Sequence, residues 1–169
     1  MHPLVKLAKD AVELSIRGHK VLAVRDEDLT PEMKERSGVF VCLKVRGMLR
    51  GCIGTFEPAE KNVASEIVRN AVSSATCDPR FTCVGENELA DLEYSVDVLT
   101  APEQVKGPGE LDPKRYGVIV QAGNRRGLLL PDLEGVDTVE EQVNIAMQKA
   151  GIPRGTPLTL FRFEVKRYH

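Results

Sequence analysis

The chain has 169 residues, a length that fits one domain with room for two lobes. Hydrophobic residues make up 42% of it and charged residues 28%, as in an ordinary globular protein with a core. The formal net charge of −2 excludes a general electrostatic attraction to nucleic acid or to an anionic membrane. No apolar run approaches the roughly 20 residues of a membrane helix, and no signal-peptide pattern opens the chain. We therefore expect a cytoplasmic protein.

The first half of the chain predicts a helix, a hairpin, a second helix and a strand. Apolar residues at 3–4 spacing predict an amphipathic helix over 3–17, ended by Gly18. Alternating residues predict a strand over 38–45. The other elements expected here are a polar loop over 26–37, a return strand with glycine interruptions over 49–56, a helix over 62–76 capped by Asn62, a helical turn over 87–92, and a strand over 93–100.

The second half predicts the same order of elements after a loop over 101–116. Thr138 and Glu141 form a capping box for a helix over 139–150, which Gly151 ends. The strands expected in this half are a hairpin of 117–123 and 127–131, and a single closing strand over 158–168.

The two halves also share short strings of sequence. GVFV at Gly38 echoes GVIV at Gly117, and Arg50-Gly51-Cys52 echoes Arg126-Gly127-Leu128. We interpret this as an internal duplication of a hairpin–helix–strand unit. Because hairpins pair antiparallel, the predicted fold class is α+β, mainly antiparallel β-sheet with flanking helices. The expected lobes, about 1–105 and 106–169, share one core.

The spacing of the cysteines limits the metal and redox sites that the chain can form. The four cysteines, at 42, 52, 77 and 83, form no CxxC pair, so the common zinc and thioredoxin spacings are absent. In a reducing cytoplasm we expect four free thiols. No dinucleotide, P-loop or metalloprotease motif occurs either, so we expect no cofactor and no metal.

Several strings together carry a family resemblance. LRGCIGT, DPRF, SVDVL, DPKRYGVIV, GLLLPDLEGVDTVEEQ and KAGI occur in this order. The chain resembles the AMMECR-one domain family over about Leu4 to His169, and within it the prokaryotic AmmeMemoRadiSam branch. The resemblance implies a two-lobed α+β fold. It also implies partnership with a Memo-like protein and a radical SAM protein, and it implies no particular reaction.

The LRGCIG string contains the sharpest candidate for chemistry, Cys52. A nucleophilic cysteine needs a nearby cation or backbone N–H groups to lower its pKa, and Arg50 is expected on the same side of the strand. Gly51 and Gly54 would let a ligand or a second chain segment approach closely. The alternatives are that Cys52 lines a ligand pocket, or that it only packs, since its repeat counterpart is Leu128.

A second candidate is the DPRF string. Asp78 and Arg80 form either an anion clamp, since arginine binds carboxylates bidentately, or a turn in which Asp78 bonds its own backbone and Arg80 pairs with a surface acid. A base for Cys52 is not evident, because no histidine lies in a motif. A three-thiolate site built from Cys52, Cys77 and Cys83 is a weaker hypothesis.

Two functional hypotheses follow, from different classes. The preferred one is an accessory binding protein with a ligand or partner site around LRGCIG. The site residues expected are Arg50, Gly51, Cys52, Gly54, Asp78 and Arg80. The alternative is an enzyme in which Cys52 is the nucleophile and Arg50 stabilises its thiolate. RNA binding through Arg125 and Arg126 is weaker, because no aromatic residues interleave with these arginines.

Overall fold

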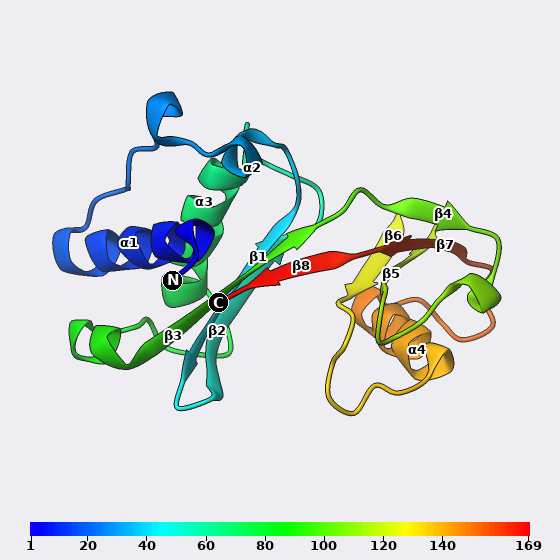
Figure 1. Ribbon diagram of the computed structural model, residues 1–169. Helices are drawn as coiled ribbons and strands as arrows, with labels where there is room; N and C mark the ends of the chain where they lie inside the picture. The colour runs from blue at the N-terminus through cyan, green and yellow to red at the C-terminus, as the bar shows by residue number, and fades with distance from the viewer. The chain divides into compact units, whose positions relative to one another are not determined.

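The computed structural model describes all 169 residues, and the chain separates into two compact units (Figure 1). Unit 1 comprises residues 1–98 and 166–169, and unit 2 comprises residues 99–165. Each unit has a four-stranded sheet and a hydrophobic cluster of its own. The pairing is antiparallel in both, so the fold class is α+β, as predicted. No helix is long and apolar enough to cross a membrane.

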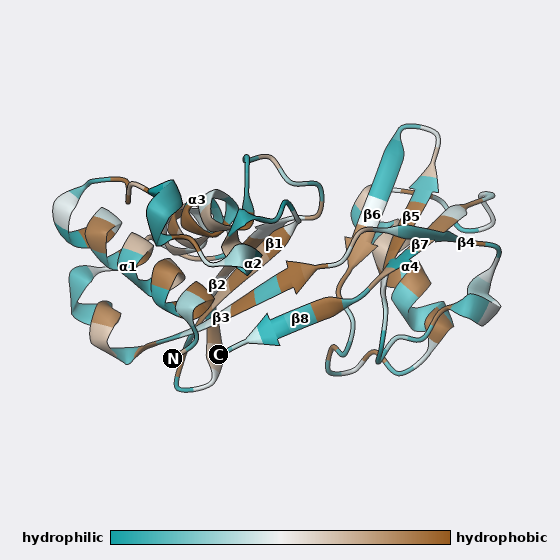
Figure 2. Ribbon diagram, turned by 45° about the horizontal axis from the view of Figure 1, so that its top comes forward, coloured by the Kyte–Doolittle hydropathy of each residue, from teal (hydrophilic) through white to brown (hydrophobic).

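The sheet of unit 1 has the order β2-β1-β3-β8, which leaves β2 at one edge. Its central strand β1 buries Val39, Val41 and Leu43 on one face, as the alternating sequence predicts. Figure 2 shows this apolar character along β1 and β3, and the hydrophilic end of β8. The strands are β1 Val39–Val45, β2 Met48–Thr55, β3 Leu92–Leu99 and β8 Val165–Tyr168.

Two long helices, α1 (Pro3–Gly18) and α3 (Val63–Thr76), cover the apolar face of this sheet (Figure 1). Asn62 caps α3 by accepting a hydrogen bond from the Ser65 N–H, as predicted. His19, not Gly18, ends α1 in a left-handed conformation. The predicted loop over 26–37 is not all loop, since it contains the 3₁₀ turn η1 (Asp26–Asp28) and the short helix α2 (Pro31–Lys34), and the helical turn η2 (Glu86–Asp91) precedes β3.

The sheet of unit 2 has the order β4-β7-β5-β6, with helix α4 (Val139–Ala150) packed against β5 and β6. The predicted capping box of Thr138 and Glu141 starts α4, and Gly151 ends it at φ 65°. The strands are β4 Glu103–Val105, β5 Gly117–Ala122, β6 Arg125–Leu129 and β7 Thr159–Phe163, and a 3₁₀ turn η3 spans Pro108–Glu110. The predicted loop over 101–116 therefore contains a short edge strand that its polar sequence does not reveal.

The predicted single closing strand is wrong, because residues 158–168 form β7 and β8, which belong to different sheets. The chain leaves the sheet of unit 2 at Glu164, where Thr100 donates its N–H to the Glu164 carbonyl. The unit boundary likewise lies after Val98, with the last four residues returning to unit 1, whereas the sequence suggested a division near 105. Each of the two clusters of buried residues lies within one unit.

The two units repeat one arrangement, as the shared sequence strings predict. In β2-β1-β3 and in β6-β5-β7 the first hairpin strand lies in the middle, flanked by its partner and by the strand after the helix. A Cβ on Gly51 would lie 2.1 Å from the Ser74 carbonyl oxygen of α3, and one on Gly127 would lie 2.0 Å from the Ala146 carbonyl oxygen of α4. Both glycines therefore let a helix backbone lie directly on a strand.

Candidate functional site

The geometry of LRGCIG starts at the β1–β2 turn. Arg46 and Gly47 both have positive φ, 50° and 74°, as in the two-residue turns that match strand twist. Val45 pairs with Met48, so an unbroken ladder would bring Gly51 opposite Cys42. A bulge at Arg50 shifts the register, and Cys42 instead lies opposite Cys52.

This register joins Cys42 and Cys52 in a disulfide, with 4.1 Å between their Cα atoms. The close approach is typical of a non-hydrogen-bonded antiparallel pair. The prediction of four free thiols is therefore wrong for this pair, and only Cys77 and Cys83 are free, both exposed. In this state Cys52 has no thiolate to act as a nucleophile or to join a three-thiolate site.

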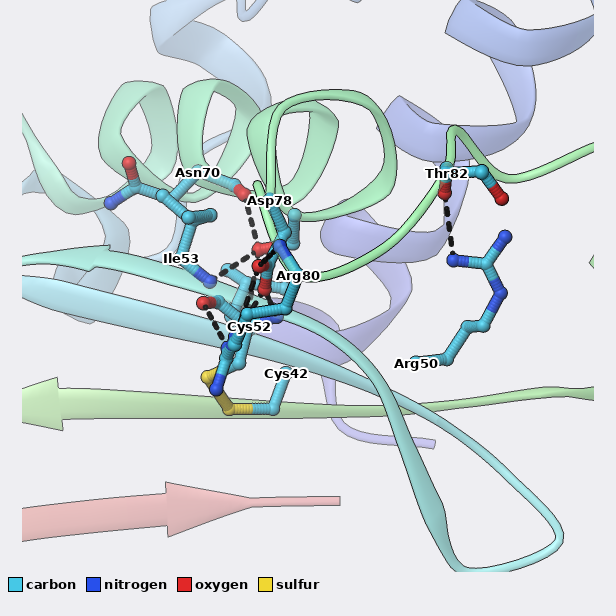
Figure 3. A network of polar contacts seen from close by, with 10 residues as sticks. Cys42, Arg50, Cys52, Ile53, Asn70, Asp78, Arg80 and Thr82 are labelled. Atoms are coloured by element: carbon cyan, nitrogen blue, oxygen red, sulfur yellow. Dashed lines mark hydrogen bonds and ion pairs between the residues drawn. A yellow bond between two sulfur atoms is a disulfide. The ribbon is translucent and has the colours of Figure 1, made fainter.

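DPRF closes the open edge of β2 at Cys52 (Figure 3). The Cys52 N–H donates to the Asp78 carboxylate at 2.9 Å, and Arg80 donates to the Cys52 carbonyl at 3.4 Å. The same Asp78 carboxylate accepts hydrogen bonds from the Arg80 N–H at 3.0 Å and from its guanidinium at 2.8 Å. Pairing of this kind protects an edge strand from adding another chain.

Asp78 is the centre of this junction, with only 5% of its surface exposed. The Arg80 guanidinium holds the pKa of Asp78 well below its ordinary value, and the N–H groups of Cys52 and Arg80 add to the effect. The turn interpretation of DPRF is thus correct in its main point, since Asp78 bonds the backbone two residues on. Arg80 pairs with Asp78 itself, not with a separate surface acid.

The alternation of a regular strand predicts that Arg50 lies beside the Cys52 sulfur. The structure places it elsewhere. The bulge directs it elsewhere, and Figure 3 shows it reaching Thr82, away from the disulfide. Its guanidinium forms two hydrogen bonds to Glu88, at 2.8 and 3.0 Å, and donates to the Thr82 carbonyl at 2.9 Å. This pairing raises the pKa of Arg50 and lowers that of Glu88. Arg50 therefore anchors the segment that leads to η2.

The two motif glycines are also used inside the fold. The space beside Gly51 is occupied by the α3 backbone at Ser74. A Cβ on Gly54 would lie 2.2 Å from the Phe40 ring, which covers that position. Of the two roles expected for these glycines, close approach of a chain segment is the one observed.

These contacts leave several side chains near LRGCIG and DPRF partly exposed. Arg80 keeps 55% of its side chain exposed, and its Nη1 makes no hydrogen bond. The Phe81 ring lies near two guanidinium carbons, 5.6 Å from that of Arg80 and 6.0 Å from that of Arg50. Met48 and Leu49, at the start of β2, are 70% and 40% exposed. We call Met48, Leu49, Arg80 and Phe81 the β2 edge patch.

Sequence reasoning missed several residues of this site. Glu88 pairs with Arg50 across 38 residues, and no local pattern predicts that contact. Ser74 donates to the Val41 carbonyl and accepts from the Ile53 N–H, which ties α3 to β1 and β2. Met48 and Leu49 did carry a signal, because two large apolar residues directly after a turn are seldom needed for the turn itself.

The other sequence candidates make contacts of their own. The His2 ring stacks on Tyr168 at 4.3 Å, and His19 ends α1, so neither is placed as a base for Cys52. Arg125 donates to the Gly151 carbonyl, and the Arg126 guanidinium lies 6.0 Å from the Phe161 ring. These two arginines are used within unit 2.

Comparison with known proteins agrees with these features. The sequence pattern of the AMMECR1 family matches residues 5–168. The chain belongs to the AMMECR1 family. A protein of Thermotoga maritima is 53% identical, over 99% of this chain and 97% of its own length. A longer protein of Clostridium acetobutylicum is 48% identical over 98% of this chain, which spans only 36% of that protein.

A solved structure supports the AMMECR1 fold. The crystal structure of an uncharacterized protein from Pyrococcus horikoshii matches with a TM-score of 0.87 at 33% identity. The match covers 97% of this chain and 88% of the other. Membership of this family fixes the fold and leaves the function to be argued from the site.

Proposed function

We propose that this AMMECR1 protein is a binding protein, and that another protein docks on its β2 edge patch. The observation that carries the proposal is that some residues around LRGCIG are bonded within the fold while others are exposed. Arg50, Cys52 and Asp78 are all engaged inside unit 1, whereas Met48 and Leu49 lie exposed on an edge strand. An edge strand that carries large exposed apolar side chains offers a surface on which another chain can pair.

The backbone of β2 adds to this surface. Val45 and Met48 flank the two-residue turn and form a hydrogen-bonded pair, so the N–H and C=O of Leu49 point to the open edge. DPRF bonds this edge at Cys52. We expect a partner strand to pair at Leu49, with a carboxylate of the partner near the free Nη1 of Arg80.

The candidate partners come from the family resemblance, which points to a Memo-like protein and a radical SAM protein. An enzyme that uses Cys52 as a nucleophile is not favoured, because the Cys52 sulfur is bonded to Cys42.

Binding of purified Memo-like and radical SAM proteins, measured by biolayer interferometry, tests the proposal. We expect at least one to bind, and Met48→Asp or Leu49→Asp to weaken the binding at least tenfold, since a charge replaces buried apolar area. Val21→Asp is the matched control, because Val21 is 79% exposed and is not part of β2. Binding that Val21→Asp weakens equally, or no binding of either protein, would contradict the proposal.

A further inference from the structure

A groove lies on α3 away from the β2 edge patch. Asn70 and Ser74 of α3 bond the Val39 and Val41 carbonyls, so the face with Val68 and Val72 is a different one. An extended segment after α1 runs beside that face and borders an open groove of about 450 Å³. Its lining is Val21, Leu22, Val24, Glu60, Ser65, Val68, Arg69, Val72 and Ser73. The volume lies in the range of small-molecule sites.

The walls of this α3 groove are aliphatic and incompletely packed. One wall of the groove is held in place, because its residues are half-buried against the core of unit 1. They are Leu22, Val24 and Val72. Val21 on the rim is 79% exposed, although it is a large branched hydrophobic residue. An aliphatic ligand between the rim and α3 would remove this apolar surface from water.

The polar side chains of the groove include one cation, Arg69. Arg69 contacts Glu60 through one nitrogen at 3.4 Å, and the two side chains are 50% and 39% exposed. Such an exposed pair is weak, and the other guanidinium N–H groups of Arg69 make no hydrogen bond. The hydroxyls of Ser65 and Ser73 lie on the same helix face, and Glu60 is the one acidic side chain in the lining. The unpaired N–H groups of Arg69 favour an acceptor at the polar end of a ligand.

We propose that the α3 groove binds a small aliphatic carboxylate. The alkyl chain lies along Val21, Val68 and Val72, and the carboxylate pairs with the free side of the Arg69 guanidinium. Arginine presents a planar fork that matches a carboxylate bidentately, which favours this head group over a neutral one. The site is separate from the surface proposed for partner proteins.

Titration with straight-chain alkanoates of about six to ten carbons, followed by methyl NMR of labelled Val and Leu, tests the proposal directly. Each added methylene should tighten binding about fourfold, as expected for one buried CH₂. The saturable shifts should centre on Val21, Leu22, Val24, Val68 and Val72. The primary amide of equal length should bind at least tenfold more weakly.

Two variants separate the chain contact from the head-group contact. Val21→Asp should weaken binding of the longest alkanoate at least tenfold, whereas Met48→Asp, on the β2 edge patch, should leave it unchanged. Arg69→Gln should abolish the preference for carboxylate over amide and keep the dependence on chain length. Shifts that do not saturate, that centre on other methyl groups, or that ignore chain length would overturn the proposal. Failure of protein–protein binding would leave this result unaffected.

Discussion

Asp78 holds the junction of LRGCIG and DPRF, so its carboxylate is the most informative atom group to remove. Asp78→Asn should lower the free energy of unfolding at pH 7 by about 1–3 kcal/mol, because the charged acceptor shared by Cys52 and Arg80 is lost. Urea unfolding measures the change. Asp91→Asn, at an exposed carboxylate without a hydrogen bond or ion pair, is the control and should change little.

The depressed pKa of Asp78 also predicts how stability changes with pH. The folded-state pKa lies below the ordinary value of 3.8, so the unfolded chain binds the proton more readily. The stabilisation is therefore complete above about pH 4 and is lost as the pH falls through the folded-state pKa. Over pH 7 to 2 the wild type should lose stability more steeply than Asp78→Asn. Parallel curves for the two proteins would show that Asp78 is not the group responsible.

Arg50 acts through several directional hydrogen bonds from its planar guanidinium and not only through its charge. Arg50→Lys retains the positive charge but loses the paired hydrogen bonds to Glu88 and the bond to Thr82, so we expect a loss of about 1–2 kcal/mol. Backbone amides of residues 83–89 should exchange with solvent faster in the variant. Arg46→Lys at the exposed turn serves as the control. Unchanged exchange in 83–89 would refute an anchoring role for Arg50.

At the scale of elements, each sheet depends on one helix lying directly on a strand. Gly51→Ala and Gly127→Ala should each lower the free energy of unfolding by about 1–3 kcal/mol. The reason is that the new methyl group meets the carbonyl oxygen of Ser74 or of Ala146, respectively. Gly109→Ala, where a Cβ would meet nothing within 4 Å, should be nearly neutral. Thermal unfolding of the three variants decides this. A neutral Gly51→Ala would mean that α3 does not press on β2 as described.

At the scale of the whole molecule, local signals in the sequence predict much of the fold. The caps of α3 and α4 are formed by residues within three positions of each helix start, and the alternation in β1 is visible directly. The split of β7 from β8 was not predictable in this way, because the continuous strand pattern does not show which sheet each half joins.

The candidate site shows the same limit. The sequence picked out Arg50, Cys52, Asp78 and Arg80, and the structure brings Cys52, Asp78 and Arg80 together. The sequence did not predict the Cys42–Cys52 bond, since a single bulge residue decides whether Cys52 or Gly51 faces Cys42. Long-range partners such as Glu88 also leave no trace in local spacing.

Residue-resolved thiol labelling by mass spectrometry, with cells lysed directly into an alkylating agent without reductant, tests the central claim that Cys52 is part of the structural framework and not a nucleophile. We predict that Cys77 and Cys83 are alkylated, and that Cys42 and Cys52 are recovered as one disulfide-linked peptide pair. Alkylation of Cys52 in the native protein, faster than that of Cys77 and Cys83, would contradict this account and restore Cys52 as a nucleophile.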